Sequence, residues 1–395
     1  MNETIYMPVG EVCSSISDTY REKKNMVTLI NTSDVLEGRV LNHERVPNSN
    51  LKGQFKKTFQ RDDILYSEIR PQNRRFAYVD FSPIDYIAST KLMVIRAKKD
   101  VVSPKYLYYF LKNSSTVAEL QLLAETRSGT FPQITFSEVA NLTIPVPPLA
   151  VQEVIVQTMQ CLEDKTICNE QINDNLQQQA AALFESWFVN YDPWDGVQPS
   201  EWENAPLGSF VEIKRGGSPR PIQDFLSDSG LRWLKISDVT SLSSPFVLEI
   251  KEHIKEEGLR KTVFLHAGEL VLSNSATPGI PKILDVDTCI HDGWLYFPKS
   301  ELSKYYLYLF FKHIRKELVA LGNGSVFTNL KTDILKAFPA TKADESTLKE
   351  FDALVTPLFD AMLNADRENF KLAAMRDALL PKLMSSEIDV SEVEL

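Results

Sequence analysis

The chain has 395 residues, of which 43% are hydrophobic and 24% charged, and this length predicts two or three domains. No run of eighteen apolar residues occurs, so we expect no membrane span, and the N-terminus lacks the basic start and apolar core of a signal peptide. The net charge of −10 argues against nucleic acid as a partner, but most of the acid lies in 151–190 and 341–395. The four cysteines lack metal-ligand spacing, which favours a reduced, cytoplasmic protein.

Residues 1–145 have the pattern of a mixed α/β domain. β-rich runs with turn residues between them lie at Met26–Ile30, Asp63–Tyr66, Phe76–Val79 and Lys91–Ile95. A helix is predicted from Pro104 to about Ala124, and a turn-rich loop follows it.

A first long helix is predicted over 146–190. It follows the prolines at 145, 147 and 148 and ends before Pro193, because proline is tolerated at a helix start but stops a helix at its end. Two heptad lines run along it, namely Ile155, Leu162, Asn169, Leu176 and Leu183, and Met159, Thr166, Asn173, Ala180 and Trp187. Such a helix spans about 60 Å, and its single apolar stripe requires a partner helix.

A second mixed domain is predicted over 191–340, after a linker rich in Pro, Trp and Asp. Residues 341–395 then hold a second long helix, from about Ser346 to Met384, and an acidic tail. Its apolar stripe comprises Phe351, Leu358, Ala365, Leu372 and Leu379, with Leu354, Ala361 and Met375 on a second line. This stripe supplies the partner that the first helix needs.

The two halves of the chain form an internal repeat. Matching segments keep their order at offsets of roughly 200 residues, for example Tyr106-Leu107-Tyr108 against Tyr306-Leu307-Tyr308, and Ser-Asp-Val at 33–35 against 237–239. We therefore expect an α+β fold with two pseudo-repeated mixed α/β globular domains separated by an antiparallel coiled coil of two long helices. A spacer of fixed length would act as a ruler between the two globular domains.

No catalytic motif is present, because the chain lacks a Walker A loop, G-x-G-x-x-G, H-E-x-x-H and G-x-S-x-G. One arrangement resembles a metal nuclease: Asp238 precedes Glu249 and Lys251, and two carboxylates with a lysine can hold a divalent cation and an attacking water. A metal-dependent nuclease is therefore one alternative function, and a coiled-coil scaffold that binds only protein is another.

Cationic and amide side chains cluster in patterns that suit DNA. Arg and Lys neutralise phosphates, whereas Arg, Gln and Asn also contact base edges. The candidates in the first half are Lys52, Gln54, Lys56, Lys57, Arg70, Gln72, Asn73, Arg74, Arg75, Arg127, Gly129 and Thr130. Those in the second half are Lys214, Arg215, Gly217, Ser218, Arg220, Asn274, Ser275, Thr277, Gly324 and Ser325. Gly217 belongs to a glycine-containing loop whose backbone N–H groups could approach an anion.

Together these features resemble the specificity subunit of type I restriction-modification enzymes. The resemblance rests on Ile-Pro-Val-Pro-Pro-Leu at 144–149 leading into the long helix, on Leu-Phe-Glu-Ser-Trp-Phe at 183–188, and on the Gly-Thr-Phe-Pro loop at 129–132. The Lys-Arg-Gly-Gly-Ser-Pro loop at 214–219 is similar to the Gly-x-[ST]-Pro loop of the family. The resemblance covers nearly the whole chain and includes the repeat.

The resemblance implies a non-catalytic subunit that reads double-stranded DNA, with one target recognition domain for each half of a split site and helices that set the gap. It implies two methylation subunits as partners, and restriction and translocation subunits through them. Any S-adenosylmethionine, ATP and Mg would then belong to those partners. The polar heptad centres at Asn169 and Asn173 are either register devices or surfaces where methylation subunits dock.

Overall fold

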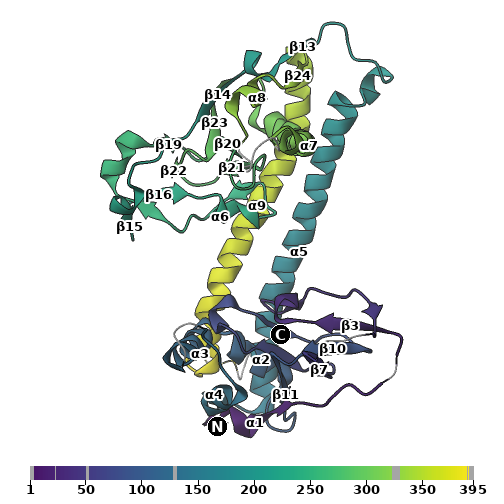
Figure 1. Cartoon of the computed structure of the whole chain (residues 1–395), viewed down its shortest axis with the longest axis vertical. Helices are drawn as coiled ribbons and strands as arrows, with labels where there is room; N and C mark the ends of the chain where they lie inside the picture. Colours follow the sequence, from purple (N-terminus) through teal and green to yellow (C-terminus); the bar gives the residue numbers. More distant parts are fainter. Residues whose placement is uncertain are drawn as a thin grey trace. The chain divides into compact units, whose positions relative to one another are not determined.

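The computed structural model describes residues 4–22, 24–49, 53–127, 131–322, 330–388 and 390. The chain forms two compact units, residues 1–164 with 372–395, and residues 165–371. Two forty-residue helices, α5 (Leu149–Phe188) and α9 (Glu345–Met384), each contribute residues to both units (Figure 1). Among the described residues, no helix combines the length and the apolar character that a membrane crossing requires.

Unit 1 contains two four-stranded sheets. The first is antiparallel, in the order β2 (Cys13–Ile16), β11 (Leu92–Ala97), β8 (Ile64–Ser67) and β9 (Phe76–Tyr78). The second has the order β6 (Val46–Pro47), β3 (Met26–Ile30), β10 (Tyr86–Ser89) and β7 (Phe55–Lys57), with β10 parallel to β3. A short hairpin, β4 (Val35–Leu36) with β5 (Arg39–Val40), forms its own ladder, and its turn residue Gly38 bridges Ala77 of β9.

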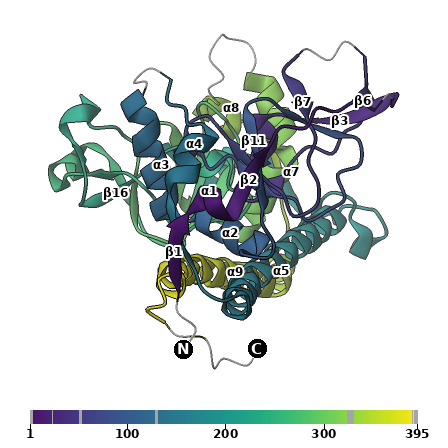
Figure 2. The same ribbon diagram turned by 90° about the horizontal axis from the view of Figure 1, so that it is seen from below.

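The helices of unit 1 are α1 (Val9–Val12), α2 (Pro104–Lys112), α3 (Ser114–Arg127) and α4 (Phe136–Asn141). The single helix predicted from Pro104 to Ala124 is broken, because Asn113 has an extended backbone (ψ 136°) and its side-chain oxygen accepts a hydrogen bond from Ser115 N. α2 lies against the first half of α5 (Figure 2), where the Tyr109 hydroxyl donates to Glu163 over 2.9 Å.

Unit 2 repeats this plan with five-stranded sheets. Its first sheet has the order β14 (Val211–Arg215), β23 (Trp294–Ser300), β20 (Leu270–Ser273), β21 (Pro281–Leu284) and β17 (Phe246–Val247). Its second has the order β15 (Leu226–Ser227), β18 (His253–Ile254), β16 (Leu231–Leu234), β22 (Thr288–Ile290) and β19 (Val263–Leu265), again with one parallel central pair, β16 and β22. The helices are α6 (Ser237–Thr240), α7 (Lys304–Gly322) and α8 (Thr332–Lys336).

Equivalent hydrogen bonds recur in the two units and confirm the repeat. β1 (Ile5–Pro8) pairs antiparallel with β12 (Thr143–Val146), just as β13 (Glu203–Pro206) pairs with β24 (Pro339–Lys342). The Tyr106 hydroxyl donates to Pro145 O over 2.9 Å, and the Tyr306 hydroxyl donates to Thr341 O over 2.7 Å. The expected pseudo-repeated α+β fold is therefore confirmed.

Within unit 2 the two long helices run antiparallel, and a polar layer lies between them. Asn169 donates to Glu368 and Asn369 on α9, and Asn173 donates to Asp366 over 2.7 Å. Both asparagines are at least 94% buried, so they pair the helices and do not form an exposed docking surface. Of the two interpretations offered by the sequence, the structure supports the register device.

Asp366 joins this helix pair to the globular part of unit 2. Its carboxylate also accepts a hydrogen bond from the hydroxyl of Ser244, in the loop before β17, and burial raises the pKa of Asp366 above its usual value. Beside it, Arg367 donates two hydrogen bonds to Asp285, at 2.6 and 3.0 Å. The orientation of the globular part on the helices thus depends on buried or bidentate polar contacts.

We predict that Asn173→Ala destabilises the chain by about 1–3 kcal/mol, because it leaves one oxygen of the half-buried Asp366 carboxylate without its donor. Asn175→Ala is the matched control, since Asn175 is exposed on the same helix. Urea unfolding of both variants measures the difference, and equal midpoints would show that the polar layer does not stabilise the helix pair.

Candidate nucleic-acid interface

Three of the predicted cations in unit 1 are used within the domain. The Lys57 ammonium donates to the carbonyls of Thr90 and Leu92, at 3.1 and 2.8 Å, and burial lowers its pKa. Arg74 pairs with Glu37 at 3.2 Å and donates to Lys112 O. Arg75 likewise donates to the carbonyls of Ser33 and Val35. These side chains hold the fold, which the sequence-based prediction did not anticipate.

The exposed candidates of unit 1 gather on one turn. Arg70, Gln72 and Asn73 are all exposed on or beside the 3-10 turn Pro71–Asn73, which connects β8 with β9. Backbone contacts fix this turn, because Arg70 N donates to Pro132 O and Gln72 N donates to the side chain of Gln121. Gln54 and Lys56 are exposed elsewhere in unit 1, on or next to β7.

Five predicted residues lie outside the described residues, namely Lys52, Gly129, Thr130, Gly324 and Ser325. The side chain of Arg127 is also outside the description, although its backbone ends α3. The segments that follow the predicted loops at 129–130 and 324–325 are nevertheless held by equivalent backbone hydrogen bonds. Ile134 N donates to Glu68 O in unit 1, and Leu330 N donates to Asn274 O in unit 2. Ile134 and Leu330 are therefore tied to the residue that follows an equivalent strand, β8 or β20.

In unit 2, the glycine-containing loop is shaped by close backbone packing. A Cβ atom on Gly216 would lie 2.2 Å from His291 O, and one on Gly217 would lie 3.0 Å from Lys261 O. The two N–H groups donate to Trp294 O and Ile290 O. The expectation that these N–H groups would approach an anion is therefore wrong, since both are already used inside the domain.

The polar side chains on either side of these glycines are at the surface. Lys214 is exposed and pairs with Glu212 at 2.9 Å, and Arg215 is exposed and donates to Asp292 O. Ser218 and Arg220 of the same loop line a groove of about 780 Å³. Ser275, from the second predicted segment, lines the same groove, together with Trp233, Lys235 and His291. The fold thus brings together two predicted groups that are more than fifty residues apart.

Two members of the Asn-Ser-Ala-Thr segment are structural. Asn274 is 2% exposed, and its backbone bridges Gly293 and Leu330, so the prediction that its side chain reads bases does not fit its burial. Thr277 is half-buried, and its carbonyl accepts a hydrogen bond from the Ser273 hydroxyl over 2.6 Å. Ser275 and Ala276 of this segment line the groove, and of the three predicted residues only Ser275 does so.

Asp292 organises the rim of the groove, although no sequence pattern indicated it. Its carboxylate accepts hydrogen bonds from the Ser218 hydroxyl over 2.7 Å and from Arg220 over 3.3 Å. The Ser218 hydrogen bond, with a smaller contribution from Arg215, lowers the pKa of Asp292. Asp292 therefore stays ionised at neutral pH, and only the tertiary fold brings it to a loop more than seventy residues earlier.

His291 contributes a neutral donor to the groove. Burial lowers its pKa below the usual value, so its ring is uncharged at pH 7. Gly293 N donates to His291 Nδ1 over 2.8 Å, which places the ring proton on Nε2. The groove thus offers hydroxyl, imidazole and guanidinium donors beside an apolar wall, a combination that suits base edges.

Asp238 of the nuclease-like arrangement has another role. The Asp238 carboxylate accepts a hydrogen bond from Lys235 N over 3.0 Å, and its repeat equivalent Asp34 accepts one from Asn31 N over 2.7 Å. Both aspartates therefore cap turns of the repeated frame. Among the described residues, no group of three or more His, Cys, Asp or Glu side chains could hold a metal ion.

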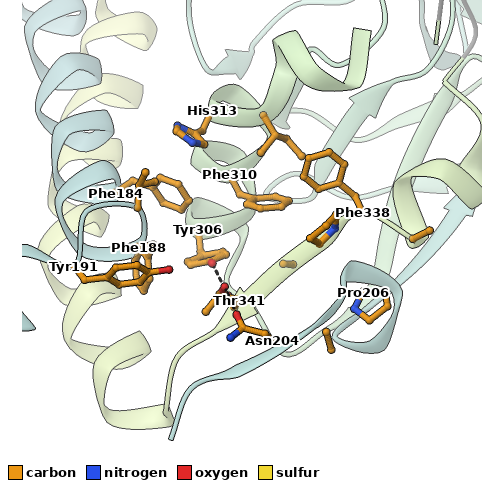
Figure 3. Close-up of a pocket in the computed structure, with 16 residues that line it drawn as sticks. Phe184, Phe188, Tyr191, Asn204, Pro206, Tyr306, Phe310, His313, Phe338 and Thr341 are labelled. Atoms are coloured by element: carbon orange, nitrogen blue, oxygen red, sulfur yellow. Dashed lines mark hydrogen bonds between the residues drawn. The ribbon is translucent and has the colours of Figure 1, made fainter. Parts of the chain in front are cut away.

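A second hollow in unit 2, of about 520 Å³, is apolar. Phe184 and Phe188 of α5 line it together with Tyr306 and Phe310 of α7 (Figure 3). Its sixteen described lining residues include His313 but no Lys or Arg. Such a lining offers no cation to neutralise phosphates, so this hollow does not have the character of a nucleic-acid surface.

Comparison with known proteins establishes the class. The family of type I restriction modification DNA specificity domains matches residues 6–178 and 199–341, and the chain belongs to this family. It is 29% identical to the type I restriction enzyme HindI specificity subunit of Haemophilus influenzae, over 92% of this chain and 94% of that protein. It is also 25% identical to the type I restriction enzyme MjaIX specificity subunit of Methanocaldococcus jannaschii, and that match covers 79% of this chain and 77% of that protein.

A solved structure shows the same fold. The S subunit of a type I restriction-modification system from M. genitalium superposes with a TM-score of 0.56 at 15% identity, covering 99% of this chain and 97% of that one.

We predict that Gly216→Ala destabilises unit 2 by about 1–3 kcal/mol, because the added methyl would overlap backbone atoms that cannot move aside cheaply. Gly53→Ala serves as the control, since a Cβ there meets nothing within 4 Å, and we expect a change of at most about 0.5 kcal/mol. Thermal unfolding of the two variants compares them. Equal melting temperatures would mean that the loop does not depend on this close approach.

Proposed function

We propose that this chain is the DNA sequence-recognition subunit of a type I restriction-modification complex, in which each globular part reads one half of a bipartite target. The observation that carries the proposal is the repeated anchor Ile134 N–Glu68 O and Leu330 N–Asn274 O. In unit 1 this anchor lies beside the exposed side chains of the Arg70 turn. In unit 2 it lies beside the Arg220 groove.

The chain itself carries out no chemistry in this proposal. Two methylation subunits that use S-adenosylmethionine would modify the DNA, and restriction and translocation subunits that use ATP and Mg would join through them. The four cysteines, all unpaired, and the DNA target support a place of action in the cytoplasm. Double-stranded DNA is the ligand whose phosphates and base edges fit exposed Arg, Gln and Asn side chains.

We further propose that the paired helices set the number of unspecified base pairs between the half-sites. Four residues add about 6 Å to an α-helix, and successive base pairs are about 3.4 Å apart. Inserting four residues at matched levels of α5 and α9 should therefore widen the gap by one or two base pairs, as read by methylome sequencing. The same insertion in the exposed turn after Asp228 is the control, and an unchanged gap in the helix variant would contradict the ruler.

Each half of the target should respond to one unit only. We expect the double variant Arg70→Ala, Gln72→Ala to lose or relax one specified block while the other block stays intact, because the altered side chains lie on the exposed turn of unit 1. Arg45→Ala, which removes an exposed cation paired with Asp85 at 3.4 Å, is the control. Equal changes in both blocks would argue against separate half-site readers.

A further inference from the structure

Arg220 is exposed, yet its side chain has a hydrogen-bond partner and its backbone is restrained. Its side chain is 79% exposed, yet its guanidinium donates to Asp292, and Ser218 of the same loop donates to the same carboxylate. Pro219 and Pro221 flank Arg220 and limit the backbone conformations open to it. A long surface arginine would ordinarily sample many rotamers, so this restraint requires an explanation.

Fold stability does not supply that explanation. An ion pair this exposed contributes little, because water screens both charges and holding the side chains costs entropy. The loop is already anchored by the backbone hydrogen bonds of Gly216 and Gly217. The pair is better suited to holding a guanidinium ready for a ligand, since restraint before binding lowers the cost of ordering on binding.

The chemistry of the guanidinium selects the ligand. Arginine has five N–H donors in a planar fork, and the contact with Asp292 uses one N–H of Nη2, so four donors remain. The remaining donors match two acceptors side by side, as guanine presents with O6 and N7 in the major groove. Ser275 and the neutral His291 line the same groove, so neighbouring base edges would meet hydrogen-bonding groups.

We propose that Arg220 reads a guanine in the half-site recognised by unit 2, and that Asp292 is the positioning residue that aims it. This inference rests on the proposed function and names the base and the residue that the proposed function leaves open. It requires that one specified block of the target contain a G·C pair at the position governed by Arg220.

The test maps N6-methyladenine in a host that lacks the gene and carries the wild type or one variant, with the partner subunits present. For Arg220→Ala we expect one G·C position in one block to become degenerate, with discrimination there falling about tenfold or more. The other block and the gap stay unchanged. Asp292→Asn should loosen the same position less severely, and Arg220→Lys should restore only part of the preference, because lysine cannot form the fork.

Arg232→Ala is the matched control. Arg232 is exposed on β16, and side chains alternate along a strand, so it points away from the face of Trp233 that lines the groove. An unchanged motif in Arg220→Ala, or the same degeneracy in Arg232→Ala, would overturn the assignment of Arg220 while leaving the proposed function intact.

If Arg220→Ala abolishes methylation altogether, the Arg220→Lys and Asp292→Asn maps decide the question. Relaxation confined to one G·C position supports the proposal, and wild-type motifs in both variants reject it. A wild-type gene that governs no split motif at all would instead contradict the proposed function.

Discussion

The structure depends on the pairing of α5 with α9. A forty-residue helix with one apolar stripe cannot bury that stripe alone, and each helix supplies the surface that the other lacks. At the polar centre, Asn169 and Asn173 are buried against Glu368, Asn369 and Asp366. Burying polar groups is costly unless they are hydrogen-bonded, and a shifted register would leave the side-chain N–H donors of both asparagines without these partners. The pairing is therefore specific in register as well as favourable.

The repeated frame fixes where the globular parts attach to the helices. Equivalent tyrosines, Tyr106 and Tyr306, are buried and donate to the strands that precede α5 and α9. Equivalent aspartates, Asp34 and Asp238, cap equivalent turns. By contrast, the residues best placed to contact DNA lie on segments that differ between the copies, the Arg70 turn and the Arg220 loop. A repeated scaffold with divergent loops would allow one chain to recognise two unlike half-sites.

Much of the fold could be predicted from the sequence because its signals are periodic or repeated. The heptad stripes and the Tyr-Leu-Tyr match indicated the two helices and the two globular parts. The break at Asn113 was missed because a single local hydrogen bond ended a pattern that otherwise continued.

The site was predicted less well. Cationic residue types indicated Arg70 and Arg220, but also Lys57 and Arg75, whose donors are used on backbone carbonyls of the same domain. Whether a cation serves the fold or a ligand depends on tertiary contacts that composition does not contain. Asp292 was missed for the same reason.

The central claim is that this chain directs methylation to a split DNA sequence. Its most direct test is a map of N6-methyladenine across the host genome, with the gene present and with the gene deleted. The account predicts that deletion removes methylation from one motif, consisting of two short specified blocks around a fixed gap. In a host whose methylation subunits are active, a methylation map that does not change on deletion would contradict it.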